Sequence, residues 1–217
     1  MASKSKLAQK RQATSAKKIN FYLIGIPVFA FFIKLIIMAN IKGTDGAMLG
    51  GWLGADGENY ITGFNALLRD GIFSKESILN YWPAGYPLII LLLSILGKSW
   101  ALTTLSIVQS LIFSFAAYLF ASQLARTRIK KYAYLVFLLI IFNPTLSLIS
   151  IAVGYESLTA SGFLITAALV IKDFIERNDK KFIKYLVINS MVFGLLTFMQ
   201  PRLIVSGILT NLLWILM

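Results

Sequence analysis

The sequence predicts an all-α polytopic membrane protein with about six transmembrane helices and a long polar loop after the first of them. Hydrophobic residues make up 58% of the 217 residues, charged residues only 14%, and the mean hydropathy is +0.76. This composition is too apolar for a soluble domain. Short basic clusters separate the apolar runs, as the orientation of a membrane protein requires.

The apolar runs define the candidate spans. A helix needs about 20 residues to cross a ~30 Å hydrocarbon core. Runs near that length lie at roughly 19–39, 100–124, 132–152, 155–172, 184–200 and 203–217. The run Leu88–Leu96 reaches only about a dozen residues with its flanks, which suits a juxtamembrane or interfacial helix. We expect Asn143 and Pro144 to kink or fray the third span rather than to mark a site.

The basic residues predict the orientation. They cluster before the first span, at 126–131 and at 172–184. All three clusters are cytoplasmic only if the 88–96 run does not cross the membrane. This arrangement predicts a cytoplasmic tail over 1–18, a transmembrane domain over 19–217 and an outer loop over about 40–99, in the cytoplasmic (plasma) membrane. The last apolar run lacks a polar anchor, so we expect the chain to be the N-terminal part of a longer protein.

The composition also narrows the chemistry. The chain contains neither cysteine nor histidine, so thiolate and imidazole chemistry is excluded, and catalysis would depend on carboxylates, Lys, Arg, Tyr or backbone groups. The net charge of +12 would suit nucleic acid only on a basic face of a soluble fold. We therefore expect a lipid bilayer as a partner and no nucleic acid.

The outer loop concentrates the polar residues that could form a site. Five of the nine acidic residues and ten of the fifteen glycines lie between Asn40 and Trp100, together with the aromatic and proline-rich run Tyr81–Pro87. Long loops of this kind commonly carry function. The predicted topology places the turns at 154–156 and 200–202 on the same side, so three polar elements would face the outside.

Within this loop, apolar residues recur at spacings of three and four and predict an amphipathic helix from Tyr60 to Gly71 on the membrane surface. Gly71 is a helix C-terminal signal. Asp56, just before the helix, can cap its N-terminus. Lys34, near the outer end of the first span, is expected to snorkel to the interface.

These residues resemble the GT-C glycosyltransferase superfamily, which includes bacterial aminoarabinose transferases and protein O-mannosyltransferases. The resemblance is carried by an outer Asp four residues before a Tyr at the head of an amphipathic helix, a Leu-Leu-x-x-Gly helix end, and a Pro-x-Gly-Tyr-Pro run before a short apolar helix. It covers most of the chain. It implies transfer of a sugar from a polyprenyl-phosphate carrier to a glycan, lipid or protein acceptor at the outer face.

The resemblance also implies roles for individual residues. Asp56 maps onto the essential acid, and Glu58 can share or take that role because the motif reads Asp-Gly-Glu; Asp45 is a weaker candidate. Arg202 corresponds to the cation that binds the carrier phosphate, with Arg69 as a lesser candidate. Glu156 corresponds to an acid in the second outer loop that supports the acceptor or metal site.

Several alternatives stay open at this point. The carboxylate could accept the acceptor's proton, or Asp56 and Glu156 could hold a divalent cation such as Mg²⁺ or Mn²⁺. Tyr60, Tyr86 and Trp82 could stack on sugar or pack the loop. A transporter or lipid-linked-sugar flippase is the rival function, and it would require charges near mid-membrane and broken helices. A non-catalytic, truncated accessory protein is a third interpretation.

Overall fold

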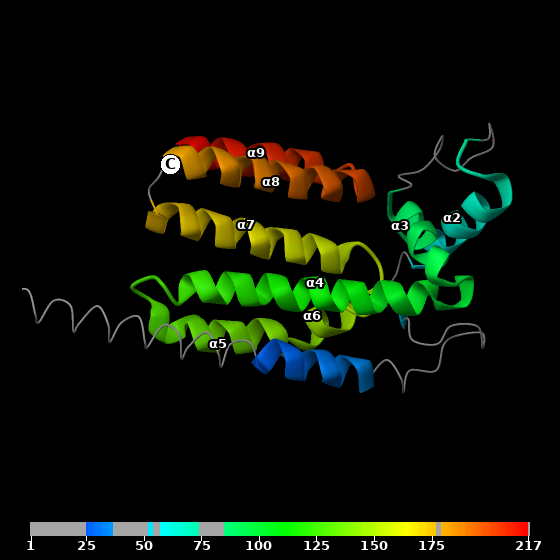
Figure 1. The fold of residues 1–217 in the computed structure, drawn as a ribbon, viewed down its shortest axis with the longest axis horizontal. Coiled ribbons are helices and arrows are strands. Elements are labelled where there is room, and N and C mark those ends of the chain that lie inside the picture. Colours follow the sequence, from blue (N-terminus) through cyan, green and yellow to red (C-terminus); the bar gives the residue numbers. More distant parts are fainter. Residues whose placement is uncertain (1–24, 37–51, 54–56, 74–84, 177–178, 217) are drawn as a thin grey trace, which may run out of the picture.

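The computed structural model describes residues 25–36, 52–53, 57–73, 85–176 and 179–216. The chain is mostly helical, and Figure 1 shows a layered bundle of long helices with two shorter helices at one end. After β1 (Trp52–Leu53), the helices are α2 (Gly57–Asp70), α3 (Gly85–Leu93), α4 (Ala101–Leu124), α5 (Lys130–Ile141), α6 (Pro144–Ile149), α7 (Glu156–Glu176), α8 (Asp179–Met199) and α9 (Leu203–Leu216), with β2 (Ala152–Val153) before α7.

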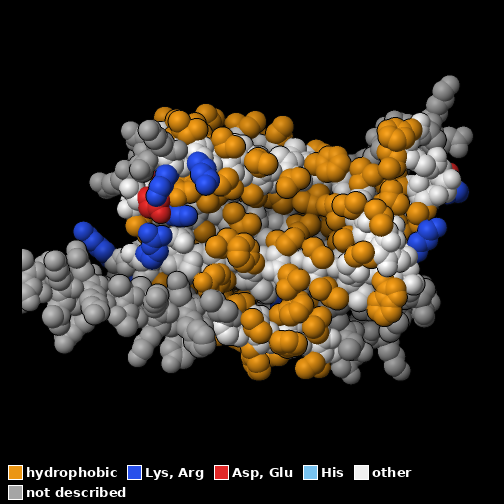
Figure 2. All heavy atoms as spheres, viewed as in Figure 1, with side chains coloured by type: hydrophobic (Ala, Val, Ile, Leu, Met, Phe, Trp, Pro, Cys, Tyr) orange, Lys and Arg blue, Asp and Glu red, His pale blue; other side chains and the backbone are white. Residues whose placement is uncertain are grey.

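Three helical segments among the described residues are long and apolar enough to cross a membrane: Lys98–Leu124, Glu156–Glu176 and Lys181–Met199. The helix Gly25–Ile36 and α9 are apolar but shorter. Large hydrophobic side chains point outward along the bundle, for example Phe29 and Leu195, which are 61% and 66% exposed. Figure 2 shows hydrophobic side chains over much of this face. The surface therefore suits lipid better than water.

The third expected span is not one continuous helix. α5 ends at Ile141 and α6 begins at Pro144, so the expected disruption at Asn143 and Pro144 is confirmed, and it is a full break between two helices. Proline lacks an N–H and its ring clashes with the preceding turn, which ends the first helix. The Asn143 side chain then accepts a hydrogen bond from the Leu146 N–H at 3.0 Å and starts the second.

The two helices of the outer segment match their expected lengths. α2 buries one face through Tyr60, Phe64 and Leu67. It ends where Gly71 adopts a φ of 81°, with its N–H donating to the Leu67 carbonyl at 3.0 Å. α3 continues as a 3-10 turn to Leu96, so the apolar segment Gly85–Leu96 is confirmed as a short helix.

α4 and α7 pack along most of their length and form the centre of the bundle, with α8 and α9 beyond α7 (Figure 1). Polar side chains join these apolar helices. Thr166 of α7 donates to the buried Asn189 amide oxygen of α8 at 2.5 Å, and the Asn189 amide nitrogen donates to Asn211 of α9 at 2.8 Å. Such bonds align helices where lipid supplies no alternative partner.

Lys34 differs from its prediction. Its side chain is 2% exposed, and its Nζ lies 4.6 Å from the centre of the Phe113 ring. Its neighbourhood includes the apolar cluster around Phe113 and Phe137. Among the described residues, Nζ has no hydrogen-bond partner. The prediction that Lys34 snorkels to the interface is therefore wrong, because the Gly25–Ile36 helix turns this side chain toward α4.

Candidate functional site

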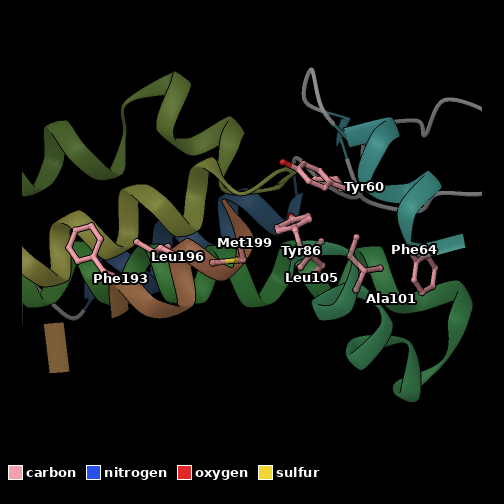
Figure 3. Close-up of a cluster of buried hydrophobic side chains, with 10 residues drawn as sticks. Tyr60, Phe64, Tyr86, Ala101, Leu105, Phe193, Leu196 and Met199 are labelled. Atoms are coloured by element: carbon pink, nitrogen blue, oxygen red, sulfur yellow. The ribbon is translucent and has the colours of Figure 1, made fainter. Parts of the chain in front are cut away.

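The end of the bundle that carries α2 and α3 gathers aromatic and polar side chains from four elements. The rings of Tyr60 (α2) and Tyr86 (α3) lie 4.6 Å apart, and Tyr155, in the turn before α7, lies 6.3 Å from Tyr60. Gln200, at the end of α8, donates to the Tyr155 hydroxyl at 3.3 Å. Figure 3 shows Tyr60 and Tyr86 together, with Met199 of the same cluster nearby. We call this region the aromatic end.

A buried hydrogen-bond network links the aromatic end to α4. The Tyr86 hydroxyl donates to the Gln109 amide oxygen at 2.7 Å and accepts from the Gly154 N–H at 2.9 Å. The Gln109 amide nitrogen donates to the carbonyls of Gly154 and Ala152 at 3.1 and 3.3 Å. Both side chains are fully buried. Each polar group therefore has a partner, as burial requires.

This network defines what Tyr86 can do. Its ring is 0% exposed, so in this conformation it packs the site and cannot stack on a sugar. Burial raises the pKa of the Tyr86 hydroxyl above its ordinary value, because the phenolate would be desolvated. Tyr86 therefore stays a neutral donor that joins α3 to α4 and to the turn at Gly154.

The same turn carries Glu156. Glu156 is the first residue of α7 and is exposed, and its carboxylate folds back over Gly154, where a Cβ would collide with it. The N-terminus of a helix favours a negative charge at this position. The backbone before this turn is also held by β1, because Ala152 and Val153 pair in parallel with Trp52 and Leu53, which lie in the outer loop a few residues before α2.

A second close approach joins α3 to α8. A Cβ at Gly85 would collide with the backbone carbonyl of Phe198, so glycine is required where the start of α3 meets the end of α8. The turn Gln200–Arg202 follows directly. Arg202 is exposed in this turn, two residues after the contact between Gln200 and Tyr155.

The structure separates the two candidate arginines. Arg69 lies near the C-terminus of α2, about 16 Å along the helix from Glu58 at a rise of about 1.5 Å per residue. Its Nε and Nη2 donate to the Asp70 carboxylate at 2.7 and 2.8 Å. These bonds lower the pKa of Asp70. Arg69 is therefore engaged by a neighbour at the far end of α2, whereas Arg202 belongs to the aromatic end.

The acidic candidates are only partly described. Glu58 is exposed in the first turn of α2. Asp56, Asp45 and Trp82 lie outside the described residues. Within the described ranges, no group of three or more acidic side chains could hold a metal ion. The predicted cation pair of Asp56 and Glu156 includes a residue outside those ranges, so it stays a prediction.

Sequence reasoning missed Gln109, Tyr155 and Gln200. The signal for Gln109 was present, because four polar residues recur along one apolar run at helical spacing: Ser106, Gln109, Ser110 and Ser114. Ser106 and Ser110 donate to the carbonyls of Ile151 and Ser150, at 2.7 and 2.9 Å. Such a run in a span indicates a face that meets polar backbone rather than lipid.

Comparisons of the chain with family models, with curated proteins and with solved structures give no match. The resemblance to GT-C enzymes therefore depends on the motifs alone and stays a prediction.

Proposed function

We propose that this chain belongs to a membrane-embedded glycosyltransferase that moves a sugar from a polyprenyl-phosphate carrier to an acceptor at the outer face of the cytoplasmic membrane. The observation that supports this most is the meeting of α2, the turn at Gly154–Glu156 and the turn at Gln200–Arg202 at the aromatic end. The topology predicted from the sequence places these three segments on the same side of the membrane.

The proposal includes the topology. Six spans, with residues 1–18 in the cytoplasm, place the aromatic end outside and the loops at 126–131 and 172–184 inside. Three of these spans correspond to helices of sufficient length, and α9 with the Gly25–Ile36 helix supplies two shorter apolar helices. The broken pair of α5 and α6 would form the remaining crossing.

The proposed reaction needs a base and a cation. The acceptor hydroxyl oxygen bonds to the anomeric carbon while its proton passes to the Asp56 carboxylate, and Glu58, two residues later in the sequence, can share or take this role. The bond between the anomeric carbon and the phosphate oxygen breaks, and polyprenyl phosphate leaves. Arg202 suits that phosphate, because a guanidinium donates two parallel hydrogen bonds. Glu156 would contact the acceptor.

The buried network gives the site its rigidity in this proposal. Tyr86 and Gln109 hold the backbone of Gly154, and Glu156 follows two residues later. A catalytic group must be held close to its productive position by such a supporting shell. Tyr86 and Gln109 are thus positioning residues, and neither is proposed to touch the reacting atoms.

The test is sugar transfer from a radiolabelled polyprenyl-phosphate sugar pool, in membranes that express the full-length gene. We expect Asp56→Asn to lower transfer by about 10²–10⁴-fold, the usual contribution of a general base. Arg202→Gln should also lower it. Asp70→Asn, an acid at the far end of α2, is the matched control and should keep transfer. Full transfer by Asp56→Asn at equal protein level would move the role to Glu58 or Asp45.

A second candidate function is favoured by two other observations. A transporter or flippase of lipid-linked sugars needs an intramembrane charge and a broken helix. Lys34 is buried without a hydrogen-bond partner among the described residues, and the chain breaks between α5 and α6. The test is the flipping of a fluorescent lipid-linked sugar across the membrane of proteoliposomes. If the protein flips this lipid, Lys34→Met abolishes the flipping and no sugar transfer is found, the transporter would replace the enzymatic proposal. If the protein shows neither sugar transfer nor lipid flipping, the result would favour a non-catalytic accessory protein.

A further inference from the structure

The end of the bundle opposite to the aromatic end carries most of the described cations. They lie in the loop between α4 and α5 and at the adjoining ends of α7 and α8. On the face drawn in Figure 2, several basic side chains surround an acidic one at this end. We call this region the basic end; its described members are Arg126, Arg128, Lys130, Lys131, Lys172, Lys181 and Lys184.

Glu176 organises part of this region. Its carboxylate lies 2.9 Å from the Lys181 Nζ, accepts from the Tyr185 hydroxyl at 2.8 Å and lies 3.9 Å from the Arg126 guanidinium. Because Arg126 precedes α5 and Lys181 belongs to α8, this one acid brings the two basic loops together. The cations of both loops therefore form one continuous surface.

The positive charge of this surface exceeds its negative charge. Seven basic side chains face two acidic ones, Asp173 and Glu176, whose side chains are described at this end. Asp173 also accepts a hydrogen bond from the Trp214 indole at 3.1 Å. Arg128, Lys130 and Lys184 make no ion pair or side-chain hydrogen bond with any described residue. Three exposed cations thus remain available for an external anion.

The side chains that follow along α5 change in the order expected at a membrane interface. Lys130 and Lys131 begin the helix, Tyr132 and Tyr134 come next and are each 48% exposed, and Leu139 beyond them is 64% exposed. Along α5, charged residues are followed by tyrosines and then by aliphatic residues, which is the order expected from the lipid headgroups to the acyl chains. The cations therefore lie at headgroup level when the apolar face meets lipid.

We propose that the basic end binds the anionic phospholipid headgroups of the leaflet that adjoins it. Guanidinium and ammonium groups donate hydrogen bonds to phosphate oxygens, and two loops joined by Glu176 present several of them at one level. Each Lys or Arg near an anionic leaflet favours contact with it by roughly fivefold at physiological salt. The opposite end of the bundle, which comprises α2, α3 and the turns beside the aromatic end, has no such excess. Among its described side chains, three cations balance three acids: Arg69, Lys98 and Arg202 against Glu58, Asp70 and Glu156.

The experiment measures the thermal midpoint of the purified full-length protein in nanodiscs of phosphatidylcholine and in nanodiscs with half phosphatidylglycerol. We expect a higher midpoint with phosphatidylglycerol, and a smaller difference in 0.5 M NaCl, since salt screens exposed charges. Lys130→Gln combined with Lys184→Gln should reduce the difference by about half. This pair leaves the contacts of Glu176 in place.

The matched control removes two exposed cations at the other end, Arg69→Gln with Lys98→Gln, and should keep the full difference. Equal midpoints of the unmodified protein in the two lipids would overturn the proposal. An equal reduction of the midpoint difference in both double variants would also overturn it, because net charge rather than the basic end would then explain the effect. If the basic-end double variant does not fold in phosphatidylcholine, the salt dependence of the unmodified protein tests the proposal: a midpoint difference that 0.5 M NaCl leaves unchanged would overturn it.

Discussion

The two ends of the bundle hold their polar residues in opposite ways. At the basic end, charged side chains are exposed, and one acid, Glu176, is shared among three partners. At the aromatic end, the neutral side chains of Tyr86 and Gln109 are buried and hydrogen-bonded to each other and to the backbone. The first arrangement suits a variable lipid surface, and the second suits a fixed backbone position.

This difference has a physical consequence for stability. An exposed ion pair contributes little, because water and salt screen it and two long side chains lose entropy. The loss of a buried hydrogen bond costs more stability, because the partner left behind stays buried without water or another hydrogen-bond partner. Substitutions at the aromatic end should therefore destabilise the fold more than substitutions at the basic end.

The largest effect is expected for Gln109→Leu. It leaves the Tyr86 hydroxyl without its acceptor and two carbonyls without a donor, so we expect a loss of about 2–4 kcal/mol. The measurement is the unfolding midpoint of the purified protein in a single detergent. Gln123→Leu, near the basic end of the same helix, is the control and should lose less than about 1 kcal/mol. Equal losses would contradict the contrast between the ends.

A smaller effect is expected for Gly85→Ala. The new Cβ collides with the Phe198 carbonyl, and because backbone cannot rotate away, α3 must shift from α8 at a cost of about 1–3 kcal/mol. The readout is again the unfolding midpoint. Gly194→Ala is the matched helical control, because nothing lies within 4 Å of its Cβ position. An unchanged midpoint for Gly85→Ala would show that the ends of α3 and α8 are not held together.

The smallest effect is expected for Glu176→Gln. The substitution removes two ion pairs but keeps a hydrogen-bond acceptor for Tyr185, so the midpoint should fall much less than for Gln109→Leu. Raising the salt concentration should reduce the difference from the unmodified protein. A loss as large as that of Gln109→Leu would mean that the basic end depends on Glu176 for its fold.

The sequence predicted the elements whose signals are local. The spacing of apolar residues and the position of Gly71 predicted α2 within a few residues, and the length of the apolar run predicted that α3 is short. Pro144 was correctly predicted to disrupt the third span, but the structure shows a full break rather than a kink. A kink and a break have the same sequence signal, and only the structure shows that Asn143 caps a new helix.

Side-chain direction was less predictable. Lys34 lies close to a helix end by sequence, which suggests snorkelling, but its direction depends on the neighbour that the helix meets. Tyr86 lies in an aromatic run typical of a membrane interface, yet α3 turns it inward onto Gln109. Both outcomes depend on packing between segments far apart in the chain.

The sequence by itself determined the helical, membrane-type character of this protein and the location of its polar segments, because hydropathy and helical spacing act over a few turns. Only the tertiary structure decided which polar groups meet. The contact of Tyr86 with Gly154 spans 68 residues, and that of Gln200 with Tyr155 spans 45. Contacts of that range follow from how whole helices pack, since each buried donor must find an acceptor wherever the fold brings one.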